Sequence, residues 1–345
     1  MSWGEPPSNA GPGDPSGYGQ DPPAYGQEPP AWGQEAPANR LRPLDLGDVL
    51  DGMFRQVRAH WRAFIIGLGI VVVPLSLLSG LVATLAFGTV PGFAEMLQDP
   101  QVAASFAAGE DIPGTIWTLM GAAVFSLAAS LLLTPLIYGI AVHVAVTGYR
   151  SGDVDPMTSV RAAARRYGGL LGTYILQGLV VFGIILIPFV LIIAAAASQS
   201  GALIALGVLS LLASMVFVVI AVVRLALAFP ALLVERIGPA DALQRSNSLV
   251  KGKTGMVFLT LLVVYIITAI IGGILGLPFS AGGGAIGDVA GAVITTLGQM
   301  VSGLVTNALL GIAIVLVYFD RRVRNEGYDL TELAAELGEP QNPPW

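Results

Sequence analysis

Long apolar runs alternate with short polar segments from residue 63 to residue 319. The runs occupy about 63–87, 113–148, 168–197, 202–234, 255–279 and 291–319. Each is longer than the ~20 residues that a helix needs to cross a ~30 Å hydrocarbon core. Because only helices satisfy every backbone group within one segment in lipid, the pattern predicts six transmembrane helices. The predicted fold class is therefore an all-α integral membrane protein.

Polar segments before spans 1, 3 and 5 carry the signals of short amphipathic helices. Before span 1, apolar residues recur at three- and four-residue steps, with Asp45 as the expected N-cap: Leu46, Val49, Leu50, Met53, Phe54, Val57, Trp61 and Phe64. Before span 3, Asp155 and Pro156 predict a capped helix start. Before span 5, Gly238 and Pro239 predict another start, with Gly252 placed to end that helix.

The basic residues predict the orientation of the chain. Every Arg and Lys except Arg224 lies before the first run, between the second and third, between the fourth and fifth, or after the sixth. The opposite loops, at 88–112, 198–201 and 280–290, contain none. The positive-inside rule then places both termini and the amphipathic helices in the cytoplasm. Because the preference for Arg over Lys and the abundance of Gly and Ala are typical of a G+C-rich bacterial genome, we expect a multi-pass protein of the bacterial cytoplasmic membrane.

Composition divides the chain into three parts. Residues 1–40 are rich in Pro, Gly and Gln, contain no Leu, Ile, Val or Phe, and repeat a heptad that starts at Tyr18, Tyr25 and Trp32. Such a segment cannot bury enough apolar surface to offset its ordering entropy, which predicts a disordered cytoplasmic tail. Residues 41–328 are the predicted six-span domain. Residues 329–345 are expected to form a short cytoplasmic C-terminal helix and tail.

The composition also excludes several function classes. Apolar residues make up 54% of the chain and charged residues 12%, where a soluble domain has about 25% charge. The absence of Cys and the presence of only two His exclude thiolate and His-rich metal sites. A net charge of −6 gives no basic face for nucleic acid. The apolar runs contain no Asp or Glu, and no HExxH or GxSxG motif is present. We therefore predict no catalytic residues, no cofactor, no metal and no nucleic-acid partner.

Two of the apolar runs are longer than a membrane span. The second and fourth have roughly 36 and 33 residues, or about 50 Å of helix at 1.5 Å per residue. They either extend beyond the membrane or break at Pro135 and Pro230. Arg224 is the charged residue inside a run, near the cytoplasmic end of span 4. A charge at the bilayer centre costs ~2.5–3.5 kcal/mol. Near the cytoplasmic end, Arg224 either extends its long side chain to the interface or is a candidate ligand for an anionic headgroup.

Three polar stretches resemble a known family. They are Arg42-Pro-Leu-Asp-Leu-Gly-Asp-Val-Leu-Asp-Gly-Met-Phe54, Glu235-Arg-Ile-Gly-Pro-Ala-Asp-Ala-Leu-Gln-Arg-Ser246 with Leu249 and Gly252, and Asp320-Arg-Arg-Val-Arg-Asn-Glu-Gly-Tyr-Asp-Leu330. The chain resembles a bacterial membrane-protein family related to the membrane domain of some glycerophosphoryl diester phosphodiesterases. This resemblance implies a polytopic membrane domain without an assigned activity. We expect no phosphodiesterase barrel in this chain, and hence no such activity.

These observations predict a non-enzymatic membrane module. Because the recognisable stretches are cytoplasmic, amphipathic and Arg-bearing, we expect association with membrane lipids, with a protein partner or with further copies of the chain. The candidate contacts to lipid, anion or partner are Arg42, Arg224, Arg245, Arg321 and Arg322. The alternative is a permease for a lipid or a small anionic solute, which would use the proline-containing spans and Arg224.

Overall fold

The computed structural model describes residues 44–88, 101, 114–150, 154–198, 200–286 and 288–326. These residues belong to one unit, Leu41–Trp345, which is separate from Met1–Arg40. The predicted tail at 1–40, the predicted C-terminal segment at 329–345 and Arg42 lie outside the described residues. The described residues form helices and no strand, so the predicted all-α fold class is confirmed for them.

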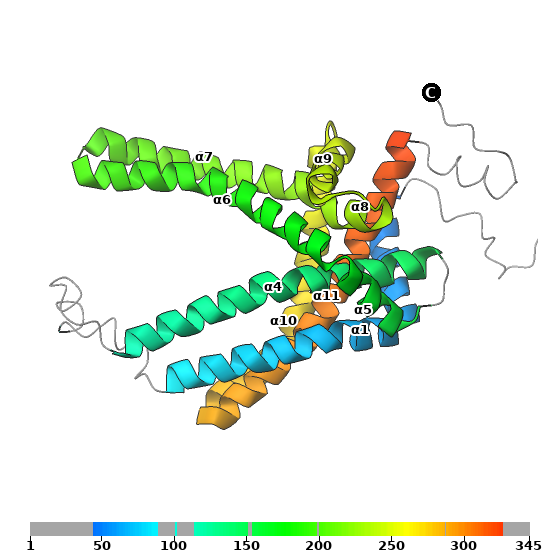
Figure 1. Cartoon of the computed structure of the whole chain (residues 1–345), viewed down its shortest axis with the longest axis horizontal. Helices are drawn as coiled ribbons and strands as arrows, with labels where there is room; N and C mark the ends of the chain where they lie inside the picture. The colour runs from blue at the N-terminus through cyan, green and yellow to red at the C-terminus, as the bar shows by residue number, and fades with distance from the viewer. Residues whose placement is uncertain are drawn as a thin grey trace, which may run out of the picture. The chain divides into compact units, whose positions relative to one another are not determined.

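Nine helices are described, and six of their segments are long and apolar enough to cross a membrane (Figure 1). The helices are α1 (Leu46–Gly88), α4 (Gly114–Arg150), α5 (Pro156–Arg165), α6 (Tyr167–Ser198), α7 (Gly201–Leu225), α8 (Ala228–Val234), α9 (Pro239–Val250), α10 (Thr254–Ile286) and α11 (Asp288–Glu326). The candidate spans are Leu46–Val82, Met120–Arg150, Tyr167–Ala195, Gly201–Val234, Thr254–Ile286 and Ala290–Glu326. The chain is therefore a polytopic membrane protein.

The predicted amphipathic helices are present before spans 1, 3 and 5. The first is continuous with span 1 in α1, with a non-helical backbone at His60 between the two parts. The second is α5, whose N-cap Asp155 accepts hydrogen bonds from the backbone N–H groups of Met157 and Thr158. The third is α9, which starts after Gly238 and is followed by Gly252 at φ 82°. This left-handed conformation is one that glycine adopts without strain.

The predicted apolar face of the first amphipathic segment is divided between two environments. Val49, Met53 and Phe64 are buried against the other helices, whereas Phe54 and Trp61 are exposed. The segment thus packs on the bundle along one edge and leaves two aromatic side chains for the surrounding medium. We call the end of the bundle that holds residues 44–62, 154–167, 235–254 and 320–326 the basic end.

The two overlong runs behave differently. α4 continues through Pro135 as one helix of 37 residues. The fourth run breaks, but at Ala226 and Leu227, four residues before Pro230. A proline ring clashes with the carbonyl of the residue four positions earlier, which is Ala226. Of the two alternatives, span 4 follows the break, at a position one helical turn before the proline itself.

The predicted outer loop at 280–290 is wrong in its extent. α10 continues to Ile286 and α11 starts at Asp288, so almost all of this segment is helical. Gly283 and Gly291 lie against each other, and a Cβ on either would clash with the backbone of the other. Without side chains at these two positions, the two helices stay in contact up to their ends, and a long loop is not needed.

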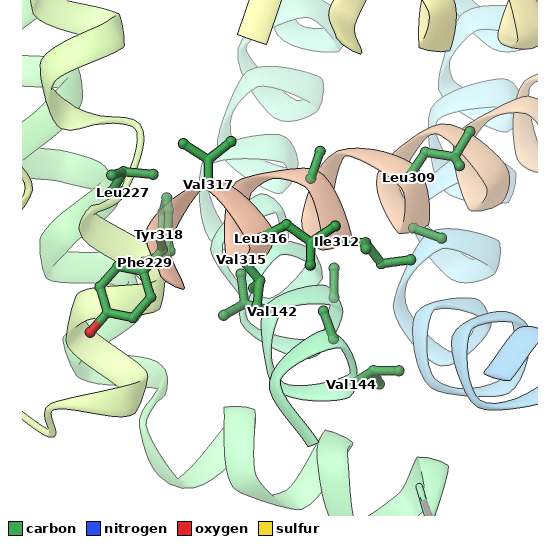
Figure 2. Close-up of a cluster of buried hydrophobic side chains, with 14 of the residues drawn as sticks. Val142, Val144, Leu227, Phe229, Leu309, Ile312, Val315, Leu316, Val317 and Tyr318 are labelled. Atoms are coloured by element: carbon green, nitrogen blue, oxygen red, sulfur yellow. The ribbon is translucent and has the colours of Figure 1, made fainter. Parts of the chain in front are cut away.

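The buried core surrounds the second half of α11. Figure 2 shows Leu309, Ile312 and Val315 of α11 with Val142 and Val144 of α4 nearby, and Leu227 and Phe229 beside Tyr318. These side chains are at most 7% exposed. α11 packs against α1, α4 and α10, and α6 packs along α7. The core therefore lies toward the basic end, where α8 and α9 also contact α11.

Candidate functional site

A groove of about 710 Å³ lies between α6, α7 and α9. Figure 1 shows α6 and α7 side by side, with α9 at the end of α7. Its lining consists of Val180, Ile184, Ile187 and Pro188 of α6, of Ser210, Ala213, Ser214, Phe217, Ile220, Ala221, Arg224 and Leu225 of α7, and of Leu243, Gln244 and Asn247 of α9. From Ser210 to Arg224, α7 rises about 21 Å at 1.5 Å per residue. This length exceeds the ~15 Å depth of one leaflet's hydrocarbon, half of a ~30 Å core.

Most of the groove is chemically apolar. Its two hydroxyl groups donate to carbonyl oxygens of their own helix, Ser210 to Gly207 at 2.8 Å and Ser214 to Leu211 at 2.7 Å. A hydroxyl bonded in this way offers little to a ligand, because its proton is already used. Both serines belong to α7, and all the lining side chains of α6 are aliphatic. The long part of the groove thus suits a hydrocarbon chain.

The polar groups of the groove gather at its α9 end. Arg224 lies in the last turn of α7, where a positive charge interacts favourably with the helix dipole. Its Nε is nevertheless buried and has no hydrogen-bond partner. Gln244 and Asn247, on the adjoining face of α9, line the same end. A buried, unbonded guanidinium nitrogen costs free energy unless an acceptor reaches it, so this end of the groove is suited to an anion.

Hydrogen bonds from other helices hold the backbone at the break between α7 and α8, where Arg224 lies. Its carbonyl oxygen accepts from the Ser246 hydroxyl at 2.7 Å, and the same hydroxyl oxygen accepts from the Leu227 N–H at 3.0 Å. The next carbonyl, of Leu225, accepts from Gln177 Nε2 at 2.7 Å. Side chains from α9 and α6 therefore replace the backbone hydrogen bonds that the break removes.

We expect Ser246→Ala to destabilise the protein by about 1–3 kcal/mol, because it leaves the Leu227 N–H and the Arg224 carbonyl unbonded in a buried place. Chemical unfolding in detergent, followed by circular dichroism, measures the change. Ser248→Ala is the matched control on the same helix, since Ser248 is exposed and donates only to Arg245 of its own helix. Equal stabilities of the two variants would contradict this role of Ser246.

Arg245 belongs to an ionic cluster on the other face of α9. Its Nε lies 2.8 Å from Glu235 Oε1, and its NH2 group pairs with Glu326 of α11. Arg322 pairs with the same Glu326 at 3.2 Å, and Tyr318 donates to Glu235 Oε1 at 2.7 Å. Burial alone would lower the pKa of Arg245, but its bonds to Glu235 and Glu326 raise this pKa above the ordinary value. The cluster holds α9 against α11.

Arg321 belongs to a second ionic cluster, which joins the end of α11 to the residues at the start of α1. Arg321 is 3% exposed and pairs with Asp320 at 2.6 Å. Arg324 pairs with the same Asp320 at 2.7 Å and donates to the Leu44 carbonyl at 2.9 Å. Asp320 also accepts from the Leu44 N–H at 2.8 Å. These bonds attach the residues before α1 to the end of α11.

The structure thus separates the candidate residues predicted from the sequence. Arg224 lies in the groove, whereas Arg245, Arg321 and Arg322 form ion pairs within the chain. Arg42 lies outside the described residues. Sequence reasoning missed Gln244 and Asn247 as groove residues, and Ser246 as a helix-break residue. The available signal was a run of polar residues from Gln244 to Ser248, with Gln244 and Asn247 three residues apart, but it did not identify their partners.

Within the described residues, no group of three or more His, Asp and Glu side chains is placed to hold a metal ion. The predicted absence of catalysis, cofactor and nucleic-acid binding stays a prediction, as do the protein partner and the homo-oligomer. The predicted membership of the phosphodiesterase-related membrane family likewise stays a prediction. No family model, curated protein or solved structure matches this chain.

Proposed function

We propose that this protein is a non-enzymatic membrane module that holds an amphiphile with an anionic headgroup in the groove between α6, α7 and α9. One observation carries the proposal: the groove is apolar for the depth of a leaflet and ends at a buried Arg224 Nε that has no hydrogen-bond partner. An acyl chain fits the first feature, and a phosphate or carboxylate oxygen fits the second.

The direction of the groove, from its apolar end to its charged end, agrees with the membrane orientation predicted from the basic residues. Its charged end lies at the basic end of the bundle, next to α9. With that end in the cytoplasm, as the positive-inside rule predicts, the headgroup site lies at the inner leaflet. The acyl chain then runs from Arg224 toward the middle of the bilayer, parallel to the lipids around it.

Native mass spectrometry of the protein released from its own membranes tests the proposal. We expect the wild-type protein to keep about one lipid per chain after the detergent is removed. Ala213→Phe fills the apolar part of the groove and should reduce the bound fraction about tenfold, as for a loss of roughly 1.4 kcal/mol. Arg224→Gln removes the charge and should have a similar effect.

Leu209→Phe is the matched control for the groove-filling variant. Leu209 is on the same helix, is 64% exposed and does not line the groove. This variant should keep the lipid at the wild-type level. Equal lipid retention by Ala213→Phe and Leu209→Phe would contradict the proposal, as would a wild-type protein that carries no lipid.

The helix break favours a second candidate, a permease for a lipid or a small anionic solute. α7 ends at Leu225 beside Arg224, and interrupted helices form the substrate sites of many transporters. Flux in proteoliposomes discriminates this candidate from a holding module. A permease gives a wild-type flux that Arg224→Gln abolishes, whereas a holding module gives none above that of protein-free vesicles.

A further inference from the structure

One face of α9 lines the groove, and residues on its other faces bond to neighbouring parts of the bundle. Gln244 and Asn247 are three residues apart and thus on one face of the helix, where both line the groove. Arg245 and Ser246 are occupied by the ionic cluster and by the helix break. The side-chain amides of Gln244 and Asn247 have no hydrogen-bond partner among the described residues, so both are available to a bound headgroup.

The lining of this end of the groove carries positive charge and no negative charge. Arg224 is the charged side chain of the lining, and the lining contains no carboxylate. Asp241, three residues before Gln244 on α9, is exposed and does not line the groove. Glu235 is engaged by Arg245 and Tyr318. A ligand cation bound in this end of the groove would therefore find no carboxylate in the lining and would lie near the Arg224 guanidinium.

We propose that Arg224, Gln244 and Asn247 together select a headgroup whose only charge is negative, such as phosphatidylglycerol, over a zwitterionic headgroup such as phosphatidylcholine. The inference rests on the proposed function and specifies its ligand class. The guanidinium pairs with the phosphate, while the two amides donate to its oxygens and accept from a headgroup hydroxyl. The cation of a zwitterionic lipid is disfavoured by like-charge repulsion in a partly desolvated site.

Lipid competition in nanodiscs with equal amounts of phosphatidylglycerol and phosphatidylcholine tests this selection. The lipid kept by the protein after transfer to the gas phase is identified by its mass. We expect the wild-type protein to keep phosphatidylglycerol in about tenfold excess, which corresponds to about 1.4 kcal/mol of discrimination. Gln244→Glu places a carboxylate beside Arg224 and should bring the ratio to about one or invert it. Asn247→Asp gives a second test of the same effect.

Met157→Glu controls for a general change of charge at the basic end. Met157 is an exposed residue of α5 and does not line the groove, so this variant should keep the wild-type preference. Equal retention of the two lipids by the wild-type protein would overturn the selection but leave the groove as a lipid site. An unchanged preference in both Gln244→Glu and Asn247→Asp would overturn the role of α9. Failure of the proposed function itself would instead appear as no lipid retained at all.

Discussion

Gly311→Ala is expected to destabilise the membrane domain by about 1–3 kcal/mol, although it adds a single methyl group. A Cβ at Gly311 would lie 2.6 Å from the Cβ of Ala141 and 3.2 Å from the Ala141 carbonyl carbon. The first contact is the severe one, and the Ala141 Cβ cannot move aside because it is bonded directly to the backbone and has no rotamers. The crossing of α11 and α4 would have to widen, and with it the core around Ile312.

A compensating exchange tests this explanation more sharply than the single variant. Gly311→Ala combined with Ala141→Gly removes the facing methyl group and should restore most of the lost stability. Gly273→Ala, within α10, is the matched control, because a Cβ there has no neighbour within 4 Å. Chemical unfolding in detergent measures all three. A double variant as unstable as Gly311→Ala would contradict a steric cause.

Arg245→Gln is expected to cost about 2–4 kcal/mol, because it leaves Glu235 and Glu326 without their shared cation. The side chains of the three residues are only 19–29% exposed, so solvent replaces the lost interaction incompletely. Release of α9 from α11 should also alter the groove, since Gln244 and Asn247 are on α9. We therefore expect lipid retention to fall together with stability.

Arg55→Gln is the control for the loss of an ion pair as such. Arg55 pairs with Asp51 at 3.9 Å, with side chains that are 72% and 80% exposed. Exposed pairs contribute about 0–1 kcal/mol, so this variant should unfold almost as the wild-type protein does. A stability loss in Arg245→Gln no larger than in Arg55→Gln would contradict a structural role for the cluster.

The spans and the short helices could be predicted because their signals are local. Apolar runs longer than 20 residues have few other solutions in lipid. Asp155 caps α5 through atoms two and three residues away, and Gly252 ends α9 through its own backbone angle. Neither requires knowledge of the rest of the fold.

The helix break and the ion pairs depend on residues that are distant in the sequence. Ser246 bonds to Arg224, 22 residues earlier, and Arg245 pairs with Glu326, about 80 residues later. The sequence shows that Arg245 and Arg322 are charged and near the membrane, but not that an acid from α11 lies between them. Lipid contact and internal pairing were therefore equally compatible with the same pattern.

The glycines likewise show that contacts between distant residues cannot be predicted from a local sequence pattern. Gly272 and Gly276 are four residues apart, a spacing of small residues that permits close helix contact, and both lie beside Ser302 of α11. Gly273 is adjacent in sequence but faces open space, and Gly168 does so as well. Gly311, at the crossing of α11 and α4 described above, has no small residue four positions before or after it. Only the position of the neighbouring helix distinguishes these residues.

Photo-cross-linking with a defined lipid tests the central claim most directly. The probe is phosphatidylglycerol with a diazirine at the end of one acyl chain, incorporated into nanodiscs with the full-length protein. If the groove holds the lipid, cross-links will concentrate on its apolar walls, at 180–188 of α6 and 210–217 of α7, and Arg224→Gln will remove them. Cross-links spread evenly over the exposed apolar residues of α6, α7 and α10, and unchanged in Arg224→Gln, would contradict the account.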